Sequence, residues 1–250
     1  MLKFSKKLFF TIVFLILNIN LYSQVIITDR PDYTESPFSI KRGQFQFELG
    51  IGFQQSGEFK EVSYPNSLLR IGLGNNSEIR FGLPRFSSVL SNDLTMYFND
   101  IVIELKHQLS NDESPFPFAL LFVSSFPTGS REVTAKIVEL GFKIAASHNL
   151  NEKLGLGLNV GAISINNNDA RQIMSIASIA FGISLSNNFS TFVEAFTEKL
   201  PGTNWQTYCD LGITYLLNKS SQLDFYLGKE LSSKEASLII GCGFSFAFGI

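Results

Sequence analysis

Few residues in this sequence could perform acid–base or nucleophilic chemistry. The chain has two histidines, His107 and His148, and histidine is the side chain that most often transfers protons near neutral pH. A catalytic histidine also needs a nucleophile and an orienting group beside it. One known lipid-hydrolysing arrangement places a serine two residues from the histidine, but Leu109 and Leu150 follow at that spacing here. We therefore expect that the chain is not an enzyme.

Metal, cofactor and phosphate chemistry also lack their usual sequence patterns. Neither histidine has a cysteine, aspartate or glutamate partner at the spacing of metal ligands. The glycines lie in segments of alternating hydrophobicity, and not in a loop before a helix, where a phosphate would bind. The sequence therefore predicts no metal site and no cofactor.

The composition narrows the class of protein. The 250 residues are 45% hydrophobic and 17% charged, and 25 of them are phenylalanine, whereas about a quarter of the residues of a soluble domain are charged. Such a chain is too apolar to be disordered. A net charge of −2 without a basic run after residue 7 argues against nucleic acid as a partner. Beyond the N-terminus, no stretch approaches the roughly 18 apolar residues of a membrane helix. A large buried β core and a lipid-facing β-barrel remain.

Residues 1–23 are typical of a secretory signal peptide. Three lysines precede an apolar run from Leu8 to Leu17, and Ser23 offers a small residue at the cleavage position. About ten apolar residues are too few to span a membrane, and no nearby cysteine could carry a lipid. Cleavage would remove three lysines and no acidic residue, which changes the formal net charge from −2 to −5.

Two cysteines, Cys209 and Cys242, remain in this exported chain. An oxidising compartment would permit a disulfide between them. Both lie on the apolar face of strand-like segments, however, where cysteine behaves as a small apolar side chain. We prefer the second interpretation.

From residue 44 onward the dominant hydrophobic period is two, which is the period of a β-strand. In residues 44–54, Phe45, Phe47 and Leu49 begin an apolar face, while glutamine, glutamate and glycine form the other face. Alternation of this kind, together with two less regular segments, predicts twelve strands. They span about 44–54, 69–74, 78–83, 100–106, 116–125, 138–144, 154–161, 173–185, 189–198, 210–215, 222–228 and 238–248.

Two of these segments are ambiguous. Residues 116–125 are apolar on both faces, so the pattern cannot assign either face to the interior. In residues 189–198, an inward Glu194 would also turn Phe192 and Phe196 inward. The boundaries of both strands therefore stay open.

The connections alternate in length. Short polar joints lie at 75–76, 110–114, 148–153, 186–188 and 218–221, and generally longer links lie at 55–66, 84–97, 126–134, 164–171, 199–204 and 229–236. Outer-membrane barrels have an even number of strands, short periplasmic turns and longer outer loops. The pattern predicts that both termini are periplasmic and that the six long links face the cell exterior.

A soluble β-sandwich also alternates, but its outward face should be rich in lysine and glutamate. Here one face is phenylalanine, leucine and isoleucine almost throughout, and the other is glycine-rich with scattered charges. We therefore predict an all-β fold in which residues 44–250 form a transmembrane antiparallel β-barrel of about twelve strands in an up-and-down meander, in contact with outer-membrane lipid. Gly243, Phe246 and Phe248 have the spacing of the C-terminal signal that the barrel assembly machinery recognises, although two residues follow the last aromatic.

Charged residues on the polar face should point into the lumen, since an arginine or lysine facing lipid costs about 2–4 kcal/mol near the midplane. They either form salt bridges that fill a narrow barrel or line a polar permeation path. The predicted luminal residues are Glu48, Arg70, Glu78, Arg80, Asp100, Glu104, Lys106, Glu139, Lys143, Glu194, Asp210 and Asp224.

Residues 24–43 precede the first strand and contain four charged residues among prolines that keep the chain out of a sheet interior. They form either a loose periplasmic tail or an N-terminal plug that narrows the pore, with Arg30 paired to a luminal acid. The candidate plug residues are Asp29, Arg30, Asp32 and Glu35.

The segment Thr28-Asp-Arg-Pro-Asp-Tyr-Thr-Glu-Ser-Pro37, followed by Gly43-Gln-Phe-Gln-Phe-Glu48, resembles the start of a bacterial family usually labelled transporters, or outer-membrane proteins of the phenol-degradation meta-pathway type. The resemblance covers most of residues 28–248 in the family's order, with a departure at His107, where an aromatic residue is expected. Further matches are at residues 99–106, 126–129, 194, 211–215, 222–224 and 241–246. The resemblance implies a twelve-stranded type of barrel linked to the uptake of small, often hydrophobic molecules, with no known substrate.

These observations leave three hypotheses. The first is an outer-membrane channel for passive uptake of small molecules that are hydrophobic or aromatic. The second is a non-conducting barrel with a structural or adhesive role, closed by its luminal salt bridges. The third is a barrel enzyme that acts on lipid, which the histidine spacing disfavours.

Overall fold

The computed structural model describes residues 25–90, 94–167, 170–233 and 237–249, and their strands form one continuous antiparallel sheet. The expected signal peptide lies outside the described residues. The strands are β1 (Gln44–Ser56), β2 (Phe59–Gly72), β3 (Ser77–Gly82), β4 (Phe86–Leu90), β5 (Leu94–Phe98), β6 (Ile101–Gln108), β7 (Phe118–Phe126), β8 (Glu139–Asn149), β9 (Leu154–Asn167), β10 (Ala170–Ser184), β11 (Phe189–Lys199), β12 (Gln206–Asn218), β13 (Ser221–Glu230) and β14 (Leu238–Gly249).

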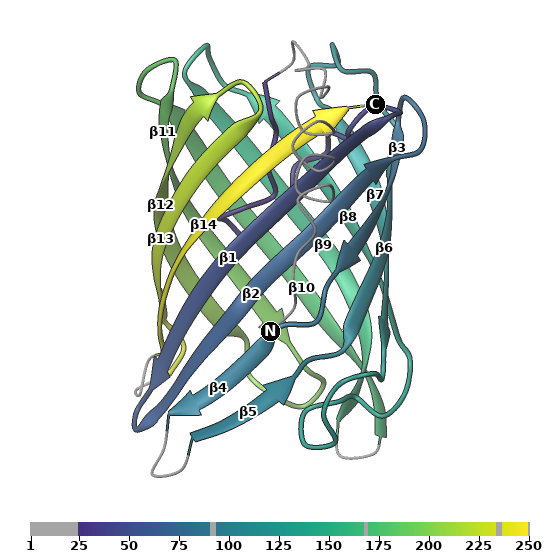
Figure 1. Cartoon of the computed structure of the whole chain (residues 1–250), viewed down its shortest axis with the longest axis vertical. Helices are drawn as coiled ribbons and strands as arrows, with labels where there is room; N and C mark the ends of the chain where they lie inside the picture. The colour runs from purple at the N-terminus through teal and green to yellow at the C-terminus, as the bar shows by residue number, and fades with distance from the viewer. Residues whose placement is uncertain (1–24, 91–93, 168–169, 234–236, 250) are drawn as a thin grey trace, which may run out of the picture.

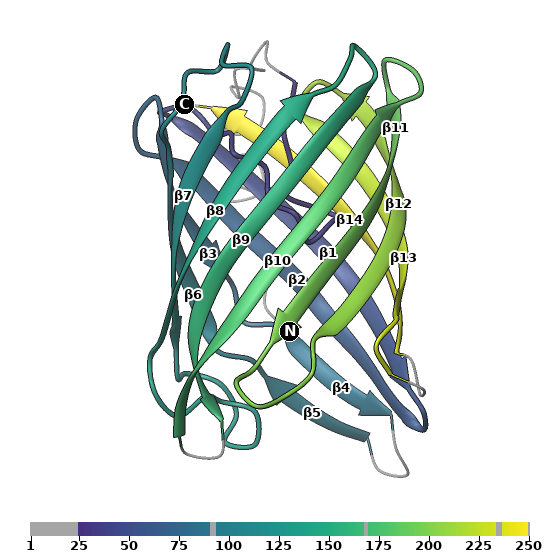
Figure 2. The same cartoon turned by 180° about the vertical axis from the view of Figure 1, so that it is seen from behind.

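The sheet closes into a barrel because β1 pairs with β2 on one side and with β14 on the other. Each remaining strand pairs with its neighbours in sequence, with one modification near β2. β3 and β4 both pair with β2, on successive parts of it, while β6 pairs with β3 and β5 pairs with β4. β3 and β4 are therefore two parts of one interrupted barrel strand, and β5 and β6 are two parts of the next. Counted in this way, the described residues form a closed up-and-down barrel of twelve strands, as predicted (Figures 1 and 2).

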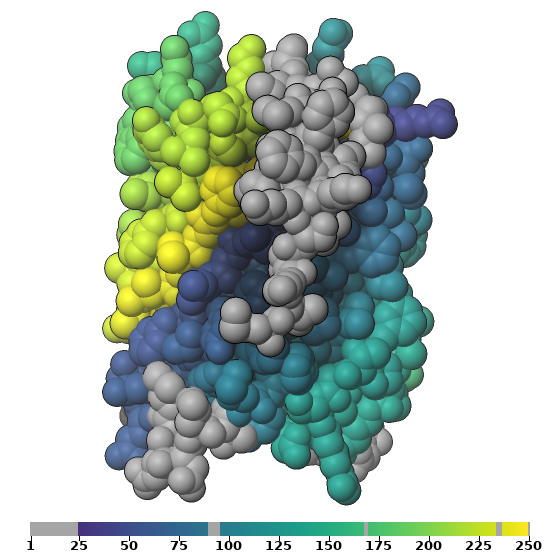
Figure 3. All heavy atoms as spheres, in the orientation of Figure 1, coloured from purple at the N-terminus to yellow at the C-terminus, as the bar shows by residue number. Residues whose placement is uncertain are grey.

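The alternation predicted from the sequence separates the two faces of the wall. Val193 and Leu211 are 52% and 53% exposed on the outside, whereas Glu48 is fully buried inside. Stacked phenylalanine rings join the first and last strands outside, where the centroids of Phe45 and Phe248 are 5.4 Å apart. In the space-filling view, the yellow side chains of β14 lie against the purple ones of β1 (Figure 3). The apolar face therefore covers the exterior of the barrel.

Both ambiguous segments are resolved by the burial pattern. In β7, Ala119 and Leu121 are fully buried inside the barrel and Phe122 is exposed outside. In β11, Glu194 and Phe192 both point inward and are almost fully buried. The inward position of Glu194 therefore does carry aromatic residues into the lumen.

Three of the predicted long links are wrong, because they belong mostly to strands. The link at 55–66 is a turn at residues 57–58 flanked by β1 and β2, the link at 84–97 contains the β4–β5 hairpin, and the link at 164–171 is mostly the ends of β9 and β10. The backbone ladder continues here without apolar alternation. Beyond the hydrocarbon layer both faces of a strand can contact water, so the pattern of period two is lost while the hydrogen bonds persist.

Other features agree with the sequence or add to it. Cys209 and Cys242 are both free, which confirms the preferred interpretation. None of the described residues belongs to a helix that is long and apolar enough to cross a membrane. Below, the end of the barrel at which β1 begins and β14 ends is called the terminal end, and the other the opposite end.

The exterior predicts a sharp response to charge. Val193→Arg places a guanidinium on the outer face near the middle of β11 and should destabilise the barrel by about 2–4 kcal/mol if that face contacts lipid. Denaturant unfolding in phospholipid vesicles measures the change, and Val193→Leu is the control. A loss below about 0.5 kcal/mol would contradict a lipid-facing exterior.

Candidate functional site

The N-terminal segment, residues 25–43, lies inside the barrel at the terminal end (Figure 1, purple). None of its residues is in a strand. Instead, its backbone N–H groups donate to inward side chains of the wall. The pairs are Asp29 to Glu48 (3.2 Å), Tyr33 and Thr34 to Glu194 (2.6 Å each), Glu35 to Asn159 (2.8 Å), Ser39 to Gln108 (3.1 Å) and Ile40 to Glu78 (2.7 Å). Side chains from many strands therefore take the place of a β-ladder for this segment.

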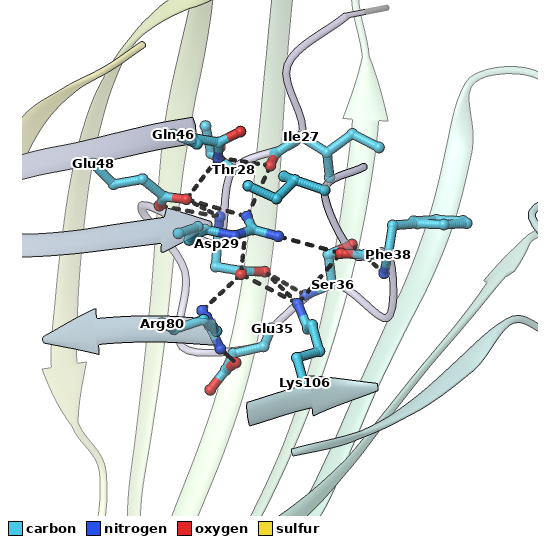
Figure 4. Close-up of polar contacts among 12 residues, drawn as sticks. Ile27, Thr28, Asp29, Glu35, Ser36, Phe38, Gln46, Glu48, Arg80 and Lys106 are labelled. Atoms are coloured by element: carbon cyan, nitrogen blue, oxygen red, sulfur yellow. Dashed lines mark hydrogen bonds and ion pairs between the residues drawn. The ribbon is translucent and has the colours of Figure 1, made fainter. Parts of the chain in front are cut away.

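Asp29 is the centre of the most extensive contact (Figure 4). Its carboxylate lies 2.7 Å from the Arg80 guanidinium, 3.1 Å from that of Arg70 and 3.3 Å from Lys106 Nζ. The three cations come from β3, β2 and β6 and are almost completely buried. One carboxylate of the segment thus neutralises charge on three strands at once.

The register of the sheet explains why these cations meet. Arg70 on β2 is directly opposite Arg80 on β3, which is opposite Glu104 on β6. One row away, Glu78 on β3 is opposite Lys106. Directly opposed like charges are unfavourable, so the two arginines need carboxylates around them.

Barrel residues and a second residue of the segment supply those carboxylates. Glu48 and Glu78 lie 3.2 and 2.9 Å from Arg70, and Glu104 lies 2.7 Å from Arg80. Glu35 of the segment pairs with both Arg80 and Lys143. We call the inward cations Arg70, Arg80, Lys106 and Lys143 with their partners the basic wall.

The cations determine the charge state of Asp29 and Glu35. Burial by itself would raise the pKa of Asp29, but Arg70, Lys106 and Arg80 outweigh it and hold that pKa well below its ordinary value. Burial likewise opposes ionisation of Glu35, while Arg80 and then Lys143 lower its pKa to about 2. Both carboxylates are therefore ionised at neutral pH.

Arg30 attaches the segment to the other side of the barrel. Its guanidinium lies 3.0 Å from Asp224 on β13. It occupies space above the opposed pair Gly50 and Gly243, which join β1 to β14. A methyl group at Gly243 would lie 2.5 Å from Arg30 Nε and 2.6 Å from the Leu49 carbonyl oxygen. Glycine is thus required there for close approach of the arginine.

A third attachment involves β11. The Tyr33 ring stacks on Phe196 with centroids 4.4 Å apart and planes 7° from parallel, and its hydroxyl donates to Glu198 at 3.0 Å. Glu194 also accepts a bond from the Thr34 hydroxyl. The segment therefore contacts the wall on opposite sides of the lumen.

The structure places the predicted luminal residues in three groups. Most of them contact the segment directly, namely Glu48, Arg70, Glu78, Arg80, Lys106, Lys143, Glu194 and Asp224. Glu104 does not contact the segment itself but pairs with Arg80, which does. Asp210 lies opposite Glu194 on β12. Asp100 and Glu139 lie apart from this cluster, where they accept backbone N–H bonds from Gly129 and Ala135, and from Asn166, respectively.

Sequence reasoning missed the uncharged members of the site. Gln46 donates to the Ile27 carbonyl oxygen at 2.9 Å, and Asn159 both donates to and accepts from Glu35 backbone groups. Both occupy inward positions of the predicted alternation. A search for inward amides, besides inward charges, would have found them.

Two cavities lie on either side of the segment. One of about 640 Å³ is lined by Arg30 and by residues of the opposite end, including Arg85 and Thr134. Another of about 400 Å³ is lined by Asp32 and by residues of the terminal end, including Asn149. Residues 30–32 therefore lie between a cavity toward each end of the barrel.

The histidines lie away from this cluster. His107 Nδ1 is 2.8 Å from Ser77 Oγ at an exposed cross-strand pair, and His148 Nδ1 is 2.7 Å from the Pro115 carbonyl oxygen. Within the described residues no acidic side chain is bonded to either ring, and no cluster of three metal-ligating side chains is present. The arrangement thus differs from a catalytic triad, which needs an acid on the histidine.

Comparisons with known proteins place this barrel among its relatives. Residues 28–248 match the model of the family described as "Putative MetA-pathway of phenol degradation". The chain belongs to this family. No curated protein sequence matches it. The match to the phenol-degradation family spans most of the segment and the barrel together.

Solved structures agree on the fold. The COG4313 outer membrane channel from Pseudomonas putida F1 is similar with a TM-score of 0.68 and 15% identity, over 89% of this chain and 100% of that one. The NanC porin is similar with a TM-score of 0.59 and 8% identity, over 80% and 98%. This member of the phenol-degradation family thus has the fold of outer-membrane β-barrels.

The network around Asp29 predicts that one substitution releases the segment. Asp29→Asn leaves three buried cations short of a partner, and breaking a buried pair costs about 3–5 kcal/mol. We expect amide protection in residues 25–43 to fall while that of β8–β12 stays, as measured by hydrogen exchange.

Asp112→Asn is the matched control. The pair of Lys41 and Asp112 is 2.6 Å long but exposed, so its loss should cost at most about 1 kcal/mol. Equal effects of the two substitutions would refute the central role of Asp29.

Acid should release the segment within a defined pH window. The pKa of Glu35 is lowered from 4.5 to about 2, so its ionised form contributes docking free energy above about pH 4.5 that is lost as the pH falls through 2. Protection factors of the segment should be similar at pH 7 and 5, and smaller at pH 2.5. Glu35→Gln should weaken docking at pH 7 and flatten this acid dependence. Unchanged protection at pH 2.5 in the native chain would contradict it.

Proposed function

We propose that this protein is an outer-membrane channel for passive uptake of small molecules, with its terminal end in the periplasm. The N-terminal segment is its plug. Along each strand, apolar side chains on the exterior alternate with polar or charged side chains on the interior. This pattern supports the role, since such a wall suits lipid outside and a polar path inside. The fold that it shares with outer-membrane barrels also supports the membrane location.

The observation that carries the proposal is the way the segment is held. It lies between two cavities and is attached by side chains rather than by a β-ladder. A segment of this kind can leave without breaking the barrel's backbone pairing. Its departure would join the cavities into a continuous path through the lumen.

We propose small apolar or aromatic molecules as the cargo. The family's description refers to phenol degradation, and a cavity of about 640 Å³ is in the size range of small-molecule sites. Inward aromatic rings such as Phe192 and Phe196 could contact such a molecule. Selectivity would come from the luminal charges and the links at the opposite end.

A non-conducting structural barrel is the second candidate. The buried ion pairs of the basic wall favour it, because they join the segment to β2, β3, β6 and β8 at the same time. In that role the segment would be a permanent internal brace. Conductance separates the two candidates.

Deletion of residues 24–40 tests the channel. Without the segment the two cavities join, so single-channel conductance in planar bilayers should rise several-fold. Asp112→Asn, which leaves the segment in place, should conduct as the native chain does. Each protein is first shown to fold by heat-modifiable gel migration. Unchanged conductance in a well-folded deletion variant would overturn the plug, and absence of conductance in it would overturn the channel.

A further inference from the structure

The inward charges of β11, β12 and β13 are all acidic in the described residues. The lysines of these strands, Lys199 and Lys229, occupy the alternate, outward positions. We call the inward carboxyl groups the acidic wall. They are Glu194, Glu198, Asp210, Asp224 and Glu230.

Only one of these carboxyl groups has a cation beside it within the described residues, namely Asp224, which pairs with Arg30. Glu194 accepts from backbone N–H groups, Glu198 from the Tyr33 hydroxyl, and Glu230 from serine hydroxyls. Neutral donors satisfy hydrogen bonding but leave the negative charge uncompensated.

Asp210 shows this deficit most directly. Its Oδ1 atom has no hydrogen-bond partner, although the residue is only 6% exposed. A buried carboxyl oxygen without a partner costs free energy, so this position favours a positively charged or donating group.

The cations of the basic wall cannot fill the deficit, because they are already paired with its own acids and with Asp29 and Glu35. Asp32 adds a further acid to the acidic side. This side of the lumen therefore carries more acidic than basic side chains.

Aromatic rings line the same wall. Phe196 lies between Tyr33 and Tyr208, with centroid distances of 4.4 and 4.8 Å and planes within 9° of parallel. Phe192, on the same inward face of β11, lines the 400 Å³ cavity together with Asp32. Carboxyl groups and aromatic rings therefore alternate along this wall, from the cavity toward the opposite end of the barrel, where β12 begins.

We propose that the acidic wall binds organic cations, in which an ammonium group is attached to an apolar or aromatic body. This proposal rests on the channel function and specifies a class of cargo for it. Aromatic faces attract ammonium groups, and the carboxylates supply the compensating charge. A neutral aromatic molecule would leave the charge of the wall unpaired, and a small hydrated cation would gain nothing from the rings.

The probe is benzyltrimethylammonium, and its neutral counterpart is benzyl alcohol. Binding to the full chain in detergent is measured by titration calorimetry, which requires no conduction and is therefore independent of the channel test. We expect the cation to bind at least tenfold more tightly than the alcohol. Equal affinities, or displacement of the cation by an equal concentration of sodium, would overturn the proposal.

Variants assign the binding to this wall. Glu198→Gln should weaken binding of the cation about tenfold. Phe192→Leu should weaken it about fivefold, since it removes a ring that lines the 400 Å³ cavity and attracts the ammonium group. Glu58→Gln, which changes an exposed carboxylate in the turn between β1 and β2, is the control and should change the affinity less than twofold. Heat-modifiable migration confirms that each variant folds. Undiminished binding in folded Glu198→Gln, or an equal loss in Glu58→Gln, would overturn the assignment.

Discussion

The buried pair of Arg70 and Arg80 is the constraint on which the interior depends. The two guanidinium groups are directly opposite each other on β2 and β3, and neither reaches bulk water. The basic wall has four cations but only three carboxylates of the barrel itself, Glu48, Glu78 and Glu104. A buried charge without a partner costs several kcal/mol. Asp29 and Glu35 of the N-terminal segment make up the shortfall, so the wall and the segment form one electrostatic unit.

Charge complementarity also orients the segment across the lumen. The carboxylates of Asp29 and Glu35 contact the basic wall, while Arg30 turns to Asp224 on the other side. Neighbouring residues of an extended chain point in opposite directions, which lets a short stretch satisfy two walls of opposite charge. Attachment mainly through side chains, without a β-ladder, keeps the segment separable from the barrel, whose strands are held by their own backbone ladders. The same division makes the interior adjustable without loss of the fold.

How far the sequence predicts this arrangement depends on the surroundings of each residue, which are lipid, water or a partner from a distant strand. Residues whose neighbours on one side are lipid follow a strict alternation, so strands such as β8 and β9, and the inward charges of β8, could be identified. The extensions of β1, β2, β9 and β10 could not, because water on both faces removes the alternation. The pairing of Asp29 with Arg70, Arg80 and Lys106 could not be foreseen either, since it depends on register between strands that are far apart in sequence. Uncharged partners such as Asn159 carry no signal apart from their inward position.

The opposed glycines of β1 and β14 show how such a barrel controls its width. Gly50 faces Gly243 and Gly52 faces Gly241, so this strip of wall is bare backbone, and the room it leaves holds Arg30 and the Tyr226 ring. The bore of a barrel is usually considered to follow from its number of strands. Here the omission of four side chains hollows an alcove without adding a strand. Evolution can therefore enlarge or narrow the interior of a twelve-stranded barrel by single substitutions at inward glycines, while circumference and strand pairing stay constant.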